Sequence, residues 1–79
     1  MSMPQALEFV GGSRDGVRGD PGPGETYPDT LFLITMDDGE AYARTGEEVV
    51  DEDGRLRAVF AFDPDGALTE RAKRAYCHA

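Results

Sequence analysis

Residues 55–62, which read RLRAVFAF, carry the clearest structural pattern in this chain of 79 residues. The even-numbered side chains are all apolar: Leu56, Ala58, Phe60 and Phe62. The odd-numbered positions begin with Arg55 and Arg57 and continue with Val59 and Ala61. Because successive side chains of a strand point to opposite faces of a sheet, this period of two predicts a strand with one apolar face.

Asp-Gly pairs punctuate the chain around this strand and predict where it turns. They are Asp15-Gly16, Asp38-Gly39, Asp53-Gly54 and Asp65-Gly66. Both residue types tolerate the backbone conformations of tight turns, so such a pair between apolar runs indicates a hairpin. We therefore expect residues 37–40 to connect strands at 30–36 and 41–45. The acidic segment 47–54 is expected to turn the chain into the strand at 55–62.

Residues 31–34, Leu-Phe-Leu-Ile, form the most apolar run of the chain. An unbroken apolar run predicts a strand that is buried on both faces, one of them covered by a helix or by a partner chain. Nearer the N-terminus, the alternation in residues 6–10 predicts a first strand, and residues 17–18 start a short second one. Residues 19–29 hold three prolines and three glycines, which predicts a loop without regular structure.

The period changes after residue 66, where Leu68, Ala72, Ala75 and Tyr76 recur at helical spacing. Asp65 or Thr69 is expected to cap this helix, and Glu70 to pair with Arg74 one turn later. The fold class predicted is α+β, mainly β. It is a small antiparallel meander of four to five strands with one short C-terminal helix on a face of the sheet. Residues 1–79 are expected to form a single domain.

The charge balance limits the partners of this protein. Sixteen acidic residues against eight basic ones give a net charge of −8. We expect no direct binding of nucleic acid, because such binding depends on a basic surface. We expect no membrane segment, since no apolar run approaches the roughly 20 residues that a helix needs to cross a bilayer. The N-terminus lacks the pattern of a signal peptide and the chain has one cysteine, so a cytoplasmic location is expected.

Several motifs suggest chemistry, but plain turns explain them better. The segments 51–54 and 63–66 contain acidic residues before a glycine, yet neither continues into the ligand spacing of a calcium-binding loop. Gly11-Gly12 lacks the Gly-Lys-Ser/Thr of a phosphate loop. Cys77 and His78 are too few to hold zinc, and no third group orients them for nucleophilic catalysis. We expect no catalytic residue, metal or cofactor.

Residues 10–16, Val-Gly-Gly-Ser-Arg-Asp-Gly, resemble the turn after the first strand of small uncharacterised proteins from actinobacteria and their phages. Tyr42-Ala43-Arg44 and Gly54-Arg55-Leu56 are similar to later parts of the same pattern. Ser13 stands where that family usually has proline. The resemblance implies a phage or prophage origin and a location in the bacterial host cytoplasm or on the virion. It implies no activity and no catalytic residue.

The leading hypothesis for function is a non-catalytic protein-interaction module, a phage accessory protein that self-associates or binds a host or virion protein. A core this small leaves little surplus stability, which favours association, including a homo-oligomer. The alternative is an acidic DNA mimic that inhibits a host nucleic-acid-binding protein, with its two acidic turns close together. A small hydrolase or ligand-sequestering protein is a third. The expected interaction residues are Phe32, Ile34, Tyr42, Arg44, Asp37, Asp38, Glu47 and Glu48.

Overall fold

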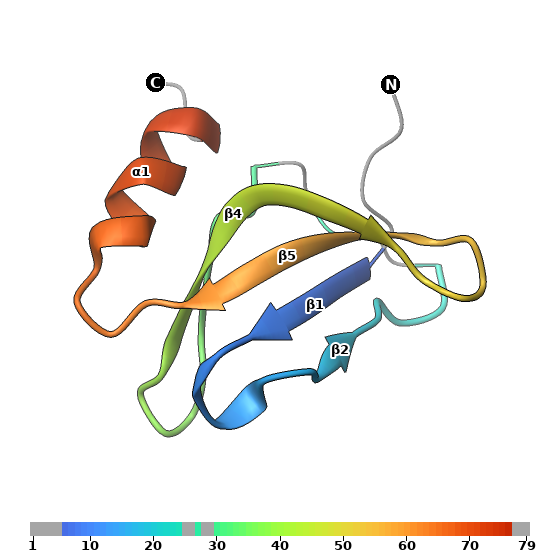
Figure 1. Ribbon diagram of the computed structural model, residues 1–79, viewed down its shortest axis with the longest axis horizontal. Coiled ribbons are helices and arrows are strands. Elements are labelled where there is room, and N and C mark those ends of the chain that lie inside the picture. The colour runs from blue at the N-terminus through green and yellow to red at the C-terminus, as the bar shows by residue number, and fades with distance from the viewer. Residues whose placement is uncertain (1–5, 25–26, 28–29, 77–79) are drawn as a thin grey trace.

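The computed structural model describes residues 6–24, 27 and 30–76, which form five strands and one α-helix (Figure 1). The strands are β1 (Ala6–Val10), β2 (Arg18–Gly19), β3 (Leu33–Thr35), β4 (Ala41–Val50) and β5 (Leu56–Phe62). A 3-10 turn, Gly12–Arg14, connects β1 to β2, and helix α1 spans Ala67–Tyr76. The expected mainly-β protein with one C-terminal helix is confirmed.

The five strands form one mixed sheet in the order β2-β1-β5-β4-β3. β1 runs parallel to β5, with Phe9 opposite Phe60, while the other neighbouring strands are antiparallel. The prediction of a purely antiparallel meander was therefore wrong. Strands that are consecutive in the sequence make two antiparallel units, the β1–β2 hairpin and the β3–β4–β5 meander. They join through β1 and β5, which places Leu7 and Phe9 beside the apolar face of β5.

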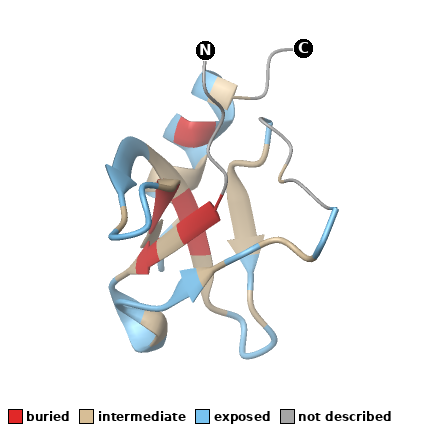
Figure 2. Ribbon diagram, turned by 90° about the vertical axis from the view of Figure 1, so that its right-hand side faces the viewer, coloured by how far each residue is buried: buried red, intermediate tan, exposed pale blue. Residues whose placement is uncertain are grey.

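The core lies on one face of the sheet and is centred on aromatic side chains. Its buried members are Leu7, Phe9, Tyr42, Ala58 and Phe60. The Phe9 and Tyr42 rings meet edge to face with their centroids 5.1 Å apart, a favoured geometry for aromatic pairs. β5 is central, so Arg57 and Val59 on its opposite face are buried as well. Figure 2 shows that the buried segments lie in the strands and in one part of the helix.

β3 corrects the prediction for the apolar run. This strand lies at an edge of the sheet and covers only Leu33–Thr35. Residues 31–34 are all half-buried, not buried on both faces as expected. The order of the strands explains this exposure. β5 lies at the centre of the sheet, and residues on both of its faces are buried, whereas β3 lies at an edge.

β4 is longer than predicted and bends strongly along its course (Figure 1). Residues 47–50 belong to the strand, so the second acidic turn is confined to residues 51–54. The register with β5 shifts between Arg44 and Glu48, which marks a bulge. Extra residues in one strand of a pair bend it and increase its twist, which accounts for the curvature of the sheet here.

Two aspartates cap the N-terminus of α1, and the sequence predicted only one of them. Asp65 accepts a hydrogen bond from the Ala67 amide, as expected. Asp63 caps more extensively, with its carboxylate accepting from the amides of Leu68 and Thr69. Thr69 does not cap the helix itself, because its hydroxyl donates to Asp63 at 2.6 Å. α1 then packs mainly against β4.

The predicted loop at 19–29 is described only in part. Gly19 belongs to β2, and residues 20–24 and 27 have no helix or strand, whereas residues 25–26 and 28–29 lie outside the described residues. Cys77 and His78 lie outside them too. Within the ranges that are described, the helix is not long and apolar enough to cross a membrane.

Candidate functional site

The Val-Gly-Gly-Ser-Arg-Asp-Gly segment forms a tight structural turn. Gly11 and Gly12 have φ angles of +79° and +64°, a region that L-residues with side chains rarely adopt. The Asp15 carboxylate closes the turn by accepting a hydrogen bond of 2.7 Å from the Gly11 amide. A side chain at Gly12 would place its Cβ 2.5 Å from the Tyr42 hydroxyl, so this glycine is required for close packing.

Tyr42, expected at an interaction surface, is instead fully buried in the core. Its hydroxyl donates to the Gly11 carbonyl at 3.0 Å and accepts from the Arg14 amide at 3.1 Å. These bonds tie β4 to the turn after β1, across about 30 residues of sequence. Tyr42 therefore serves the fold, and its assignment as an interaction residue was wrong.

The first acidic turn is held by the same 3-10 segment. Arg14 forms ion pairs with Asp38 at 3.0 Å and Glu40 at 3.1 Å. The Ser13 hydroxyl donates to the Glu40 carboxylate and is the main reason that the pKa of Glu40 lies below its ordinary value. The Glu40 amide, followed by Arg14, lowers the pKa of Asp38. Asp38, expected at an interaction surface, is exposed, but its carboxylate is already bound to Arg14 and to the Glu40 amide.

The second acidic turn is organised around a buried ion pair. Arg57 Nε lies 2.8 Å from the Asp51 carboxylate, and these side chains are 5% and 1% exposed. The other Asp51 oxygen accepts from the Asp53 and Arg55 amides. The Arg55 amide contributes most to lowering the pKa of Asp51. Glu52 pairs with Arg18 on β2, so this turn also ties the β4–β5 hairpin to the other edge of the sheet.

The two acidic turns do not form one negative surface. One precedes β4 and the other follows it, so a strand of ten residues separates them. Figure 1 shows the two turns at opposite ends of this curved strand. The expectation that a meander brings these turns together was wrong, because a turn before a strand and a turn after it lie at opposite ends.

An apolar groove opens between the two edges of the sheet. It has a volume of about 620 Å3 and receives side chains from β1, β3 and the connections beside them. Its apolar lining consists of Leu7, Phe9, Val17, Tyr27, Leu31, Ile34 and Met36. Arg14 is the one charged residue among the described residues that line it. Val17 is 46% exposed here, so an apolar ligand would cover surface that otherwise contacts water.

β3 is an edge strand of the sheet formed by the described residues, and it contributes Ile34 to this groove. The Phe32 carbonyl accepts a hydrogen bond from the Arg44 amide of β4, and the Met36 amide donates to the Glu40 carbonyl just before β4. Because backbone groups alternate in direction along an antiparallel strand, those of Leu33 and Thr35 point to the open edge. Such an edge accepts an added strand. Two apolar residues were expected at an interaction surface. Ile34 lines the groove, and Phe32 does not line it but follows Leu31, which does.

The remaining predicted residues lie apart from the groove. Asp37 is exposed in the first turn, and Glu47 and Glu48 are exposed on the bulged part of β4. Arg44 contacts the helix, with its guanidinium 4.3 Å from the centre of the Tyr76 ring. The structure thus distributes the predicted site residues among the groove, the core, the first acidic turn, the bulged part of β4 and the helix contact.

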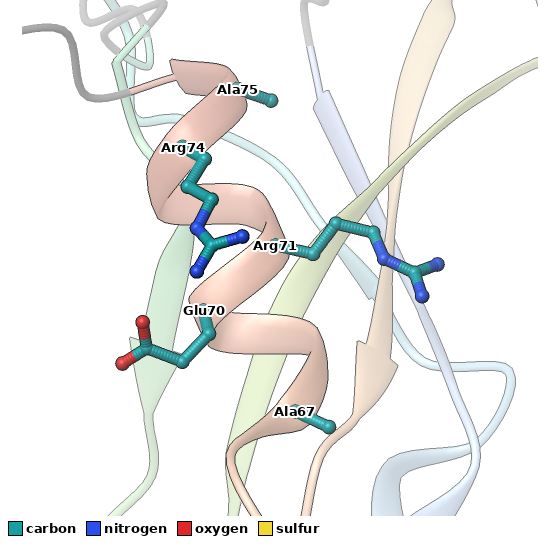
Figure 3. A pocket seen from close by; sticks show the side chains of 5 residues that line it. All are labelled: Ala67, Glu70, Arg71, Arg74 and Ala75. Atoms are coloured by element: carbon teal, nitrogen blue, oxygen red, sulfur yellow. The ribbon is translucent and has the colours of Figure 1, made fainter.

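The outer face of α1 carries a second group of charges (Figure 3). Glu70, Arg71 and Arg74 border a shallow depression that a single helix lines. Arg74 points along the helix toward Glu70, but the two form no ion pair among the described residues, contrary to the prediction. Arg71 extends away from the helix on its other side (Figure 3).

The sequence indicated only part of the groove. Leu31 and Ile34 belong to the apolar run 31–34, which the sequence singled out. Val17 and Met36 stand next to turns, where single apolar residues are common and carry no distinct signal. Comparison of this chain with protein-family models, with curated proteins and with solved structures found no match. Within residues 6–24, 27 and 30–76, no three His, Cys, Asp or Glu side chains are grouped to hold a metal ion.

Proposed function

We propose that this protein is a non-catalytic interaction module that binds an extended segment of a partner protein. The segment lies in the apolar groove and pairs with the edge of β3. The observation that carries this proposal is the groove of about 620 Å3 beside an open strand edge. Backbone pairing would supply affinity, and alternate apolar side chains of the partner would fill the groove.

Charge favours a basic partner over a second copy of this chain. Two copies at −8 each repel one another, whereas lysine or arginine residues flanking the apolar segment would be attracted. Self-association is therefore the less favoured form of the hypothesis. The resemblance described above would make the partner a host or virion protein. The phage origin and the location in the host cytoplasm or on the virion remain predictions.

The carboxylates support a non-catalytic role. A catalytic acid at neutral pH needs a raised pKa. Asp51 and Asp63 instead have lowered pKa values, because they accept backbone hydrogen bonds that hold a turn and a helix. The DNA-mimic hypothesis has less support than the interaction module, since its two acidic turns lie at opposite ends of β4.

A designed peptide with alternating valine and lysine residues tests the proposal by fluorescence polarisation. Val17→Lys, inside the groove, should weaken binding about tenfold or more. Val50→Lys makes the same charge change at a residue 67% exposed at the far end of β4 and should have little effect. N-methylation of alternate peptide amides should also abolish binding, because it removes the donors that pair with the edge of β3.

Three results would overturn this assignment. Equal weakening by both substitutions would show that charge alone drives binding. Binding of oligolysine as tight as that of the alternating peptide would favour the acidic-mimic hypothesis. A stable dimer in sedimentation analysis that Val17→Lys dissociates would assign the groove to a second copy.

A further inference from the structure

A second concavity lies between α1 and the bulge of β4, separate from the groove. Its volume is about 320 Å3, at the lower end of the range of about 300–1,000 Å3 for small-molecule sites. Residues 44–47 of β4 line one side. Arg71, Tyr76 and three aliphatic side chains of α1 line the other. Two elements far apart in sequence thus build one recess.

The bulge that shapes this recess is fixed by its own hydrogen bonds. The Thr45 hydroxyl donates to the Val59 carbonyl at 3.1 Å and accepts from the Glu47 amide at 3.1 Å. Gly46 has a φ of +89°, and a Cβ there would lie 3.5 Å from the Tyr76 hydroxyl. Bulges often direct side chains into binding sites, and hydrogen bonds within the chain hold this one in place.

Basic side chains outnumber acidic ones in the described lining of this recess. Arg44 and Arg71 border it together with one carboxylate, Glu47. Arg44 is oriented by its contact with the Tyr76 ring. Arg71 is exposed and forms no ion pair within the described part of the chain, unlike Arg14 and Arg57. Figure 3 shows Arg71 projecting away from the helix axis.

We infer that this recess binds an oxyanion, a carboxylate or a phosphate, carried on a small apolar body. A guanidinium presents parallel donors that match either group, and such charge-assisted bonds are strong. The Tyr76 ring and the neighbouring Leu68 and Ala75 give the apolar body a surface to contact. The inference is independent of the peptide groove, since none of its residues lines that groove.

An NMR titration of the full chain tests this inference with benzoate, phenyl phosphate and the neutral benzyl alcohol. Either anion should shift the amide signals of residues 45–47 and of Ala72, while benzyl alcohol should not. Arg71→Gln should weaken anion binding about tenfold or more. Lys73→Gln makes the same charge change on the same helix outside the recess and should leave binding within about twofold.

The outcomes separate clearly. Shifts with benzoate alone or with phenyl phosphate alone both support the site and identify the oxyanion. Absence of shifts at millimolar anion, shifts of equal size with benzyl alcohol, or equal weakening by Arg71→Gln and Lys73→Gln would each overturn it.

Discussion

The guanidinium of Arg57 on β5 contacts the carboxylate of Asp51 across 2.8 Å, and both side chains are almost completely withdrawn from solvent. Arg57 also donates to the Leu7 carbonyl of β1 at 3.0 Å. One arginine therefore connects the β4–β5 turn to the parallel β1–β5 pairing. An ion pair placed this deeply stabilises the fold only while both partners are present, because either charge alone is costly to bury.

Asp51→Ala should lower the free energy of unfolding clearly, because the buried Arg57 guanidinium then keeps only Asp20, at 3.1 Å, as a carboxylate partner. Urea unfolding followed by circular dichroism measures the change. Asp53→Ala, at an exposed position of the same turn, is the control and should change stability by less than about 0.5 kcal/mol. Equal effects of the two substitutions would contradict a structural role for the pair.

Gly12→Ala should destabilise the protein more than Gly16→Ala. Both glycines have positive φ, so both substitutions incur backbone strain of about 1 kcal/mol or more. A Cβ at Gly12 also meets the Tyr42 hydroxyl at 2.5 Å, whereas one at Gly16 meets nothing within 4 Å. Thermal unfolding should show the difference, and Tyr42→Phe should reduce the cost of Gly12→Ala. A Gly12→Ala protein as stable as Gly16→Ala would show that the turn is loosely packed.

Asp63→Asn should lower stability by about 1 kcal/mol at pH 7, with a difference that narrows in acid. Burial opposes ionisation of Asp63, but hydrogen bonds from Thr69 and Leu68 leave its folded pKa below the ordinary value of about 3.9. The contribution is therefore complete above that value and is lost as the pH falls through the folded pKa. Melting temperatures from pH 7 to pH 2.5 test this. Asp37→Asn, at an exposed turn position, is the control. A difference that widens in acid would contradict the assignment.

Tyr76→Leu should loosen the contact between α1 and the bulge of β4. The Arg44 guanidinium lies 4.3 Å from the ring centre, and an exposed cation–π contact contributes about 0.5–1 kcal/mol. Amide hydrogen exchange should speed up within α1 and leave β1 and β5 unchanged. Lys73→Leu changes an exposed helix residue without touching this contact and serves as the comparison. Unchanged exchange in α1 after Tyr76→Leu would mean that other contacts hold the helix.

Local pattern predicted the elements well and the candidate site poorly. The alternation in residues 55–62, the first strand and the C-terminal helix were all confirmed. Each depends on periodicity or turn chemistry within a few residues. The groove depends on Val17 and Ile34, which lie far apart in the sequence, lining the same concavity, and no short window of sequence indicates this.

The amino-acid order alone accounted for the positions of most strands, for the turns and for the helix, because side-chain alternation and Asp-Gly conformational preferences act locally. It did not specify that β1 lies parallel to β5, that Tyr42 is buried or that residues 31–34 lie at an edge. Those features follow from which strands pair over long distances. Such pairing depends on the packing of the whole core, where Phe9, Tyr42 and Phe60, from three different strands, belong to one buried cluster.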